Sequence, residues 1–258
     1  MPSLTGKIVL VTGSTSGIGL GIADCFVELG ARVMVHGLEE AQAREIVERF
    51  SRAGKDAAFV ITDLADVDAC RQTVRSTVER FGGIDVLVNN AATTARGFLE
   101  DVPVELWDRI IDVNLRAPFL CLQEAIKSMK IRGGGSIINI GSVNAYIGEP
   151  KLGPYSVSKG GLMTMTRNAA SALRKYRIRV NQINVGWTLT EGEHKVQRTE
   201  GKGPEWLDQA IATRPFGRLL SPHDVAMAAA YFASDDSALV SGAVMDLEQL
   251  PVGAPPYP

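Results

Sequence analysis

Tyr155 and Lys159 are the pair of residues in this sequence whose types and spacing could move a proton at neutral pH. They are four residues apart, so on a helix they share one face and the ammonium of Lys159 can lie near the phenol. The pKa of a phenol is roughly 10, and lowering it to about 7 requires about 4 kcal/mol of preference for the phenolate. One ammonium about 4 Å away supplies energy of that order at an effective dielectric constant of about 20. The pair could therefore exchange a proton with a substrate alcohol or carbonyl.

A glycine-rich turn near the N-terminus indicates where a nucleotide could bind. Residues 7–11 form a short, nearly continuous apolar run, which is typical of a strand buried on both faces of a parallel sheet. The run leads into Thr12-Gly13-Ser14-Thr15-Ser16-Gly17-Ile18-Gly19 and then into an amphipathic stretch over residues 20–29. A strand, a glycine turn and a helix start in this order present backbone N–H groups to a phosphate. The turn therefore predicts a dinucleotide site.

Together with Asn89-Asn90-Ala91, Asn114 and Ser142, these motifs occur in the order and spacing of the short-chain dehydrogenase/reductase family, which the chain resembles over almost its whole length. The resemblance implies an NAD(P)-dependent oxidoreductase that interconverts a secondary alcohol and a carbonyl by hydride transfer. It implies that Tyr155 is the acid/base, that Lys159 lowers its pKa and holds the nicotinamide ribose, and that Ser142 orients the substrate oxygen. It also implies that Asn114 shapes a helix irregularity and supports a water relay.

Seven apolar, strand-like runs alternate with helical patterns along the chain. They lie at residues 7–12, 32–36, 57–62, 85–89, 136–141, 178–184 and 243–247. Right-handed crossovers between such strands predict a Rossmann-type α/β fold, a single doubly wound parallel sheet with helices on both faces. We expect one domain over residues 1–250 and a proline-rich tail without regular structure over residues 251–258.

Residues 186–203 are polar and contain glycines, so we interpret them as an irregular active-site lid. Ser221-Pro222-His223-Asp224 predicts a helix start.

Composition and charge exclude several other classes of protein. The 258 residues carry a formal net charge of −2, which provides no electrostatic footprint for nucleic acid. Three cysteines and three histidines are scattered, without a Cys-x-x-Cys pair or a histidine spacing typical of a metal site. No apolar run is long enough to span a membrane, and the N-terminus has no signal-peptide pattern. We expect a cytoplasmic enzyme with a small-molecule substrate, no metal, and no nucleic-acid or membrane partner.

The segment after the second strand favours NAD over NADP. In dinucleotide folds an acid that binds the adenosine ribose usually lies about 20 residues past the glycine turn. Gly37 stands where many NAD-dependent relatives have Asp, and Leu38 where many NADP-dependent ones have Arg. Ser16 occupies a turn position that is often basic in NADP enzymes, and Glu39 and Glu40 would repel a 2′-phosphate. The predicted cofactor-binding residues are Gly13, Thr15, Ser16, Gly17, Ile18, Gly19, Gly37, Leu38, Asp63, Leu64, Asn90, Ala91, Tyr155, Lys159, Gly186, Thr188 and Thr190.

The substrate pocket is predicted to include Ser142, Asn144, Tyr155 and Trp187. The N-terminal half also resembles bacterial 3-hydroxybutyrate dehydrogenases, which hold a carboxylate with a Gln, a His and a Lys. In this sequence those positions are Thr94, Asn144 and Leu152, so a buried carboxylate would lack its partners. We therefore favour a sugar or polyol as the substrate, and a 3-hydroxy acid is the alternative.

Two further expectations concern the protein as a whole. Most relatives are oligomers, and we expect a homotetramer because small and apolar residues after Lys159 would permit close helix packing, namely Gly160, Gly161, Met163, Ala169 and Ala170. A non-catalytic nucleotide-binding protein on the same fold is the alternative of another class. Such a protein has no need for Asn114, Ser142, Tyr155 and Lys159 together, so an enzyme is favoured.

Overall fold

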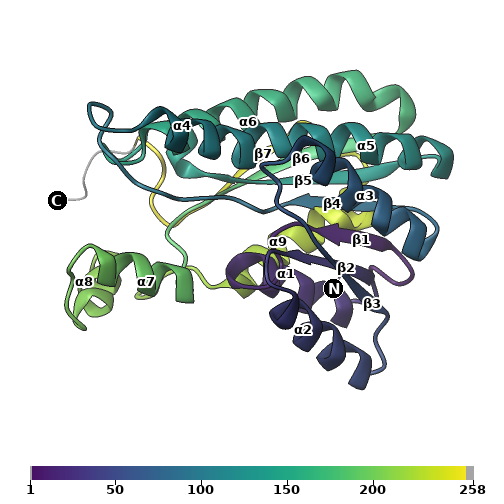
Figure 1. The fold of residues 1–258 in the computed structure, drawn as a ribbon, viewed down its shortest axis with the longest axis horizontal. Coiled ribbons are helices and arrows are strands. Elements are labelled where there is room, and N and C mark those ends of the chain that lie inside the picture. The colour runs from purple at the N-terminus through teal and green to yellow at the C-terminus, as the bar shows by residue number, and fades with distance from the viewer. Residues whose placement is uncertain (1, 254–258) are drawn as a thin grey trace.

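The computed structural model describes residues 2–253, which fold around a parallel sheet of seven strands (Figure 1). The strands are β1 (Ile8–Val11), β2 (Arg32–Gly37), β3 (Ala57–Ile61), β4 (Val86–Asn89), β5 (Gly135–Ser142), β6 (Ile178–Val185) and β7 (Val244–Leu247). Their order in the sheet is β3-β2-β1-β4-β5-β6-β7. The order reverses between β1 and β4, and open parallel sheets bind ligands in the crevice at such a switch point.

Helices cover both faces of this sheet (Figure 1), which confirms the predicted α/β class. One layer consists of α1 (Gly17–Glu28), α2 (Glu40–Arg52) and α9 (Pro222–Ala233). The opposite layer consists of α3 (Val67–Phe81), α5 (Ala117–Arg132) and α6 (Gly153–Leu173), with α4 (Val104–Ile111) packed beside α6. Two short helices, α7 (Glu191–Thr199) and α8 (Trp206–Ala212), lie apart from both layers at the lower left of Figure 1.

Strand β1 is apolar along its length because it is covered on two sides. Val9 and Val11 of β1 pack in the core beneath α1, α2 and α9, whereas Ile8 and Leu10 pack in the core beneath α3 and α5. Side chains alternate between the two faces of a strand, so one continuous apolar run fills both cores.

The predicted start of α9 is confirmed by a reciprocal cap. Ser221 Oγ accepts a hydrogen bond from Asp224 N (3.3 Å), and Asp224 Oδ2 accepts one from Ser221 N (2.7 Å). Each residue thereby satisfies a backbone donor of the other at the helix end.

The prediction that residues 186–203 are irregular was wrong in part, because α7 occupies the middle of this segment. Thr190 Oγ1 accepts a hydrogen bond from Glu193 N (3.1 Å) and caps the helix. Two acids in the first turn, Glu191 and Glu193, complement the helix dipole and stabilise α7 despite Gly192.

Of the predicted tail, residues 254–258 lie outside the described residues, and residues 251–253 contain a turn but no helix or strand. Within residues 2–253, no helix combines the length and the apolar character that a membrane span requires. The same residues contain no group of three or more His, Cys, Asp or Glu side chains placed to hold a metal ion.

Candidate active site

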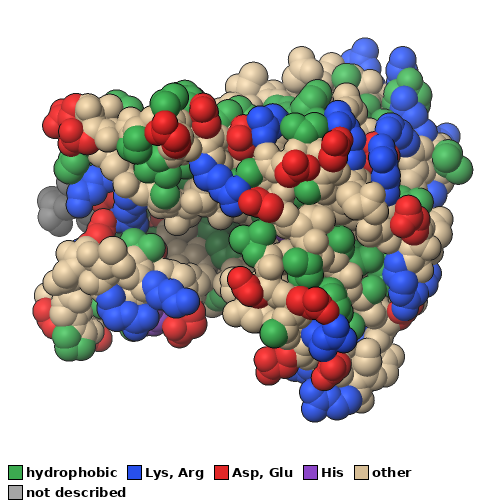
Figure 2. All heavy atoms as spheres, in the orientation of Figure 1, with side chains coloured by type: hydrophobic (Ala, Val, Ile, Leu, Met, Phe, Trp, Pro, Cys, Tyr) green, Lys and Arg blue, Asp and Glu red, His purple; other side chains and the backbone are tan. Residues whose placement is uncertain are grey.

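Three of the predicted catalytic side chains meet at the carboxyl edge of the sheet. β5 ends at Ser142, and α6 begins at Gly153, so Tyr155 and Lys159 lie in its first two turns. These side chains line one cavity of about 550 Å³, together with Asn144 and Trp187. Residues of α7 form the far wall of the cavity, and Figure 2 shows the hollow between this part of the chain and the body of the molecule.

Lys159 is held by the sheet rather than by the phenol. Its Nζ donates a hydrogen bond to Ile140 O in β5 (2.8 Å) and lies 5.6 Å from the centre of the Tyr155 ring. The side chain is buried, and burial lowers the pKa of Lys159 to about 8. The ammonium is therefore largely charged at pH 7 and loses its proton more readily than a surface lysine.

The predicted lowering of the Tyr155 pKa by Lys159 is not found in this structure. Burial of the hydroxyl raises the pKa of the Tyr155 phenol, and a hydrogen bond with Ser142 opposes this rise in part. The physical reason is that burial disfavours the charged phenolate, while the ammonium of Lys159 is hydrogen-bonded to the carbonyl of Ile140. The i, i+4 spacing brings the two side chains to one helix face, but it does not decide which group the ammonium contacts.

Ser142 keeps its hydroxyl hydrogen available for a ligand. Its Oγ accepts a hydrogen bond from Asn144 N (3.1 Å) within the short turn that follows β5. A hydroxyl that accepts from the backbone can still donate its own hydrogen. Ser142 can therefore donate to an oxygen in the cavity, that of Tyr155 or that of a substrate.

Asn114 is fully buried in a helix irregularity, as the resemblance implies. Residues Asp112–Arg116 form a π-helical turn between α4 and α5. Asn114 Oδ1 accepts from Thr93 N (2.8 Å), and its Nδ2 donates to Thr93 O (3.0 Å) and to Ser158 Oγ (3.2 Å). The amide thus joins the segment after β4 to the residue next to Lys159, which positions both elements around the cavity.

The glycine turn forms a cradle that an anion can enter. α1 begins at Gly17, and the side chain of Ser16 makes no cap hydrogen bond, so the first backbone N–H groups of the helix are left for a ligand. The first turn also lacks an acidic residue. A Cβ on Gly19 would collide with Gly13 O, so the helix start can approach the turn only with glycine there. Ile18 lines the same cavity as the catalytic residues. These features fit the pyrophosphate of a dinucleotide.

The end of β4 fixes this turn from the other side of the switch point. Asn90 N and Ala91 N both donate to Thr12 Oγ1, at 2.9 and 3.0 Å. The side-chain amide of Asn90 donates to Thr12 O (2.9 Å) and Gly13 O (3.0 Å). Gly13 has φ 63°, and a Cβ there would lie 2.8 Å from Ala91 Cα. The predicted residues Gly13, Asn90 and Ala91 are therefore in mutual contact.

The end of β2 leaves no room for an acid that binds the adenosine ribose. A Cβ on Gly37 would collide with the Thr15 side chain, so Thr15 fills the position that an Asp would need. Leu38 follows and is 59% exposed. Neither residue carries a charge toward the ribose.

Asp63 and Leu64 follow β3 and differ in what they can offer a ligand. Asp63 is exposed and accepts a hydrogen bond from Arg109 Nη1 (2.8 Å), which lowers the pKa of its carboxyl. It is not the cap of α3, because Asp66 accepts from Ala69 N (2.7 Å) there. The side chain of Leu64 is buried in the core, so only its backbone could face a cofactor.

The loop after β6 brings two threonines to the cavity. Thr188 is buried and donates to Gly186 O (3.1 Å). Thr190 lies close to the glycine turn, since a Cβ on Gly17 would be 3.7 Å from its Cγ2. Both threonines and Gly186 line the cavity, so this predicted group also converges with the catalytic side chains.

Trp187 both packs and lines the cavity. Its ring lies 6.2 Å from that of Trp206, between centroids, in a small apolar cluster beneath α8. Its Nε1 donates to Glu193 Oε1 of α7 (2.8 Å). Trp187 therefore connects the wall of the cavity to the two short helices that cover it.

Known proteins resemble this chain over nearly its full length. Residues 13–248 match the family model described as enoyl-(acyl carrier protein) reductase. The NADP-dependent (R)-specific alcohol dehydrogenase of Lentilactobacillus kefiri is 37% identical over 93% of this chain and 94% of its own. The galactitol 2-dehydrogenase of Agrobacterium fabrum is 36% identical over 91% of this chain and 93% of its own. A solved structure from Sinorhizobium meliloti 1021, provisionally assigned as a short-chain alcohol dehydrogenase, has a TM-score of 0.88 and 33% identity over 96% of each chain.

The chain belongs to the short-chain dehydrogenase/reductase family. This short-chain dehydrogenase/reductase is an oxidoreductase that acts on an alcohol or carbonyl group, and its family uses NAD or NADP. The chain thus belongs to the family that its motifs indicated. Of those motifs, Ser142, Tyr155 and Lys159 line one cavity.

This dehydrogenase also holds its glycine turn with a buried histidine that no sequence pattern indicated. His36 Nδ1 accepts a hydrogen bond from Gly13 N (2.9 Å), and its Nε2 lies 3.0 Å from Thr62 Oγ1. Burial lowers the pKa of His36 to about 4. The imidazole is therefore neutral at pH 7, and because Nδ1 accepts, its proton is on Nε2.

Arg96 is a second side chain of the cavity that the sequence did not indicate. Its Nη1 donates to Glu200 Oε1 at the end of α7 (2.8 Å) and lies 3.7 Å from Glu149 Oε2. Its Nε is buried and has no hydrogen-bond partner among residues 2–253. A buried donor without a hydrogen-bond partner is costly.

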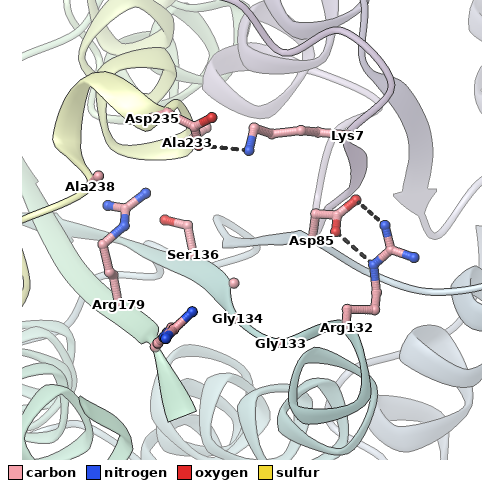
Figure 3. Close-up of a pocket in the computed structure, with 12 residues that line it drawn as sticks. Lys7, Asp85, Arg132, Gly133, Gly134, Ser136, Arg179, Ala233, Asp235 and Ala238 are labelled. Atoms are coloured by element: carbon pink, nitrogen blue, oxygen red, sulfur yellow. Dashed lines mark hydrogen bonds and ion pairs between the residues drawn. The ribbon is translucent and has the colours of Figure 1, made fainter. Parts of the chain in front are cut away.

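A further cavity, of about 350 Å³, lies at the opposite, amino edge of the sheet (Figure 3). Lys7 pairs with Asp235 (2.9 Å), and Arg132 pairs with Asp85 (2.6 Å) across its walls. Arg179 points into the same space and donates to Phe232 O (2.8 Å). These groups join strand starts to helix ends, which is typical of a structural ion-pair cluster.

Proposed function

We propose that this protein is an NAD-dependent dehydrogenase that oxidises a secondary hydroxyl of a sugar or polyol, or reduces the corresponding ketone. One observation carries the proposal: Ser142, Tyr155 and Lys159 line the same cavity as Ile18 and Thr190, which border the nucleotide cradle. A proton-transfer group and a dinucleotide site therefore border the same cavity, which is large enough for a ligand. Hydride transfer to a bound cofactor requires this arrangement.

In the proposed reaction the protein moves the proton and orients the alcohol. NAD, when bound, supplies the hydride acceptor. Ser142 donates its free hydroxyl hydrogen to the substrate oxygen and fixes that oxygen beside Tyr155. As the phenolate, Tyr155 takes the proton of the alcohol, and as the phenol it returns that proton in the reverse direction. Lys159, anchored on Ile140 O, supplies a positive charge beside the phenol and would hold the nicotinamide ribose.

The cofactor preference for NAD is supported by the charges around the end of β2. Leu38 is exposed and apolar, and Gly37 and Ser16 carry no charge. Arg44, in the helix that follows β2, is hydrogen-bonded to Glu40, so its charge is balanced by a carboxylate. A 2′-phosphate would find no free cation here, whereas a ribose diol carries no charge to be balanced.

A sugar or polyol is supported by the mixture of positive and negative charges on the cavity walls. Three cationic side chains besides Lys159 face the cavity, Arg96, Lys202 and Arg214, and three carboxylates face it as well, Glu149, Glu193 and Glu248. Such walls exchange hydrogen bonds with hydroxyl groups without requiring a charge on the ligand. The relative that acts on galactitol is consistent with this class. Lys151 is the neighbour of Leu152, which stands at the Lys position of the 3-hydroxybutyrate dehydrogenase clamp. Its Nζ lies 3.7 Å from Glu200 Oε1, which weakens the case for a 3-hydroxy acid.

The test is to incubate the protein with NAD and a panel of sugars, alditols and 3-hydroxybutyrate, and to follow NADH at 340 nm. We expect turnover with at least one sugar or alditol and none comparable with 3-hydroxybutyrate. Efficient turnover of 3-hydroxybutyrate alone would overturn the substrate proposal. NAD binding by calorimetry without turnover of any alcohol would instead favour the non-catalytic alternative.

A further inference from the structure

Glu248 lies at the active-site edge of the sheet because of the register of three neighbouring strands. Ser142 at the end of β5 is the partner of Val185 in β6, and Val185 is the partner of Leu247 in β7. Glu248 directly follows β7, and Gly186 directly follows β6. Two strand spacings, roughly 10 Å, separate the backbone at Ser142 from that at β7. A side chain from Glu248 that turns inward therefore reaches the same cavity as Ser142.

The side chain of Glu248 does turn inward. A Cβ on Gly186 would collide with Glu248 Oε2, so the carboxylate lies directly over the Gly186 backbone. Glu248 lines the cavity, and its side chain is only 10% exposed. Oε1 accepts a hydrogen bond from Gln249 N (2.6 Å), whereas Oε2 accepts none from residues 2–253. Oε1 is thus held by the backbone, and Oε2 can accept a hydrogen bond from a ligand in the cavity.

Arg214 partly balances this buried carboxylate. Its Nη1 lies 3.7 Å from Glu248 Oε1, and its guanidinium lies 5.5 Å from the centre of the Trp187 ring. At 3.7 Å the pair makes an ion contact but no short hydrogen bond, so both groups keep hydrogen-bonding capacity. Gln249 holds the loop that carries Arg214, because it donates to Arg218 O (2.6 Å) and accepts from Phe216 N (3.1 Å).

The two residues that follow β7 give this wall its charged group and fix the position of its counterion. Glu248 supplies an acceptor, and Gln249 supplies the anchor for the loop that carries Arg214. These two residues therefore shape the cavity and its charge.

We propose that Glu248 is a specificity-determining residue, whose free Oε2 accepts hydrogen bonds from the hydroxyls of an uncharged polyhydroxylated substrate and whose charge disfavours a substrate carboxylate. This inference rests on the proposed function and specifies its substrate class. Glu248 and Ser142 are two strands apart in the sheet. The hydroxyls that Glu248 binds therefore belong to carbons at some distance from the carbon that is oxidised beside Ser142. A carboxylate that accepts from a ligand hydroxyl contributes about a tenfold gain in affinity or more.

The experiment compares an alditol with the aldonic acid of the same chain length, using NAD and the wild-type enzyme, Glu248→Gln and Glu248→Gly. The Gln variant keeps the shape and an acceptor for Gln249 N, and the Gly variant removes the side chain. We expect the wild-type enzyme to prefer the alditol. Both variants should raise KM for the alditol about tenfold, with a smaller change in kcat, and should shift the preference toward the aldonate.

A Glu205→Gln variant is the matched control, because Glu205 is an exposed carboxylate that does not line the cavity. It should leave the alditol-to-aldonate ratio unchanged. A wild-type enzyme that prefers the aldonate, or Glu248 variants with an unchanged ratio, would overturn the role of Glu248 while leaving the proposed reaction intact. Turnover of simple secondary alcohols with neither alditol nor aldonate accepted would overturn both proposals.

Discussion

At the residue scale, the proposed proton path depends on three side chains that the fold holds in different ways. Lys159 is anchored on the sheet by Ile140 O, and Ser142 is anchored by the Asn144 amide. Among residues 2–253, the Tyr155 hydroxyl interacts with Ser142, and burial keeps its pKa above the ordinary value. In the protein without ligands the phenol is therefore neutral. The phenolate that accepts the proton of the alcohol forms only when groups that bind in the cavity lower the pKa of Tyr155.

The Tyr155→Phe variant should lose turnover by about 100-fold or more, because only the proton-carrying hydroxyl is removed. The affinity for NAD, measured by calorimetry, should stay within about twofold of the wild type, since ring packing is kept. Tyr231→Phe, on α9 and outside the cavity, is the control and should keep full activity. Near-normal turnover in Tyr155→Phe would contradict the mechanism.

A second residue-scale prediction concerns Leu38. The wild-type enzyme should have a higher kcat/KM with NAD than with NADP, and Leu38→Arg should shift this ratio toward NADP by about tenfold or more, because a guanidinium can pair with the 2′-phosphate. Leu38→Gln is the uncharged control and should shift the ratio little. A wild-type preference for NADP would show that this end of β2 was misinterpreted.

At the scale of elements, His36 connects the ends of three strands. It lies in β2, accepts from the glycine turn after β1, and contacts Thr62 after β3. The neutral ring is required for this arrangement, because a protonated Nδ1 could not accept from Gly13 N. Folding and the geometry of the cofactor cradle are thereby both linked to the charge of one side chain.

This linkage predicts that stability falls with acidity through His36. The pKa is about 4 in the folded protein against 6.5 for an unperturbed histidine, so the unfolded chain binds more protons between these values. The contribution of His36 is complete above pH 6.5 and is lost as the pH falls toward 4, by about 3 kcal/mol in total.

Urea unfolding of the wild type and of His36→Gln at pH 7 and at pH 4.5 measures this contribution. The wild type should lose more stability than the variant over this interval, since only the wild type carries the titrating group. His223→Gln, which removes an exposed histidine, should behave like the wild type. Equal losses in all three proteins would assign the acid sensitivity to other groups.

At the scale of the whole molecule, the residues first expected to mediate subunit contacts pack within one chain. A Cβ on Gly161 would lie 2.9 Å from Leu115, and Ala169 and Ala170 are buried in the core beneath α3 and α5. They are small because α6 lies close to its own neighbours. Exposed apolar side chains occur instead on α4, α5 and α6, at the top of Figure 1, and are Val104, Trp107, Phe119 and Val157.

We therefore expect a homotetramer in which these apolar side chains are covered by other subunits. Light scattering at micromolar concentration should give four times the chain mass of 27.7 kDa. Trp107→Glu should shift the protein to smaller species, because it places a charge among apolar contacts. A monomer mass for the wild type would refute the prediction.

The sequence by itself determined the order of strands and helices, the class of the fold and the positions of the motifs. Apolar runs such as residues 8–11 are buried on both faces, and a Ser-Pro-His-Asp start or a glycine turn acts within a few residues, so local patterns carry this information. Asn114, Ser142, Tyr155 and Lys159 were likewise predicted from the motifs that this chain shares with the family.

Only the tertiary structure decided which groups contact one another across elements. His36 and Arg96 belong to no motif, and their importance comes from partners 23 and 104 residues away in sequence. Glu248 enters the active site because the register of β5, β6 and β7 aligns three distant strand ends. The same reason explains Lys159: its spacing from Tyr155 is local, but the carbonyl that holds it belongs to β5, and that contact forms only when the sheet is assembled.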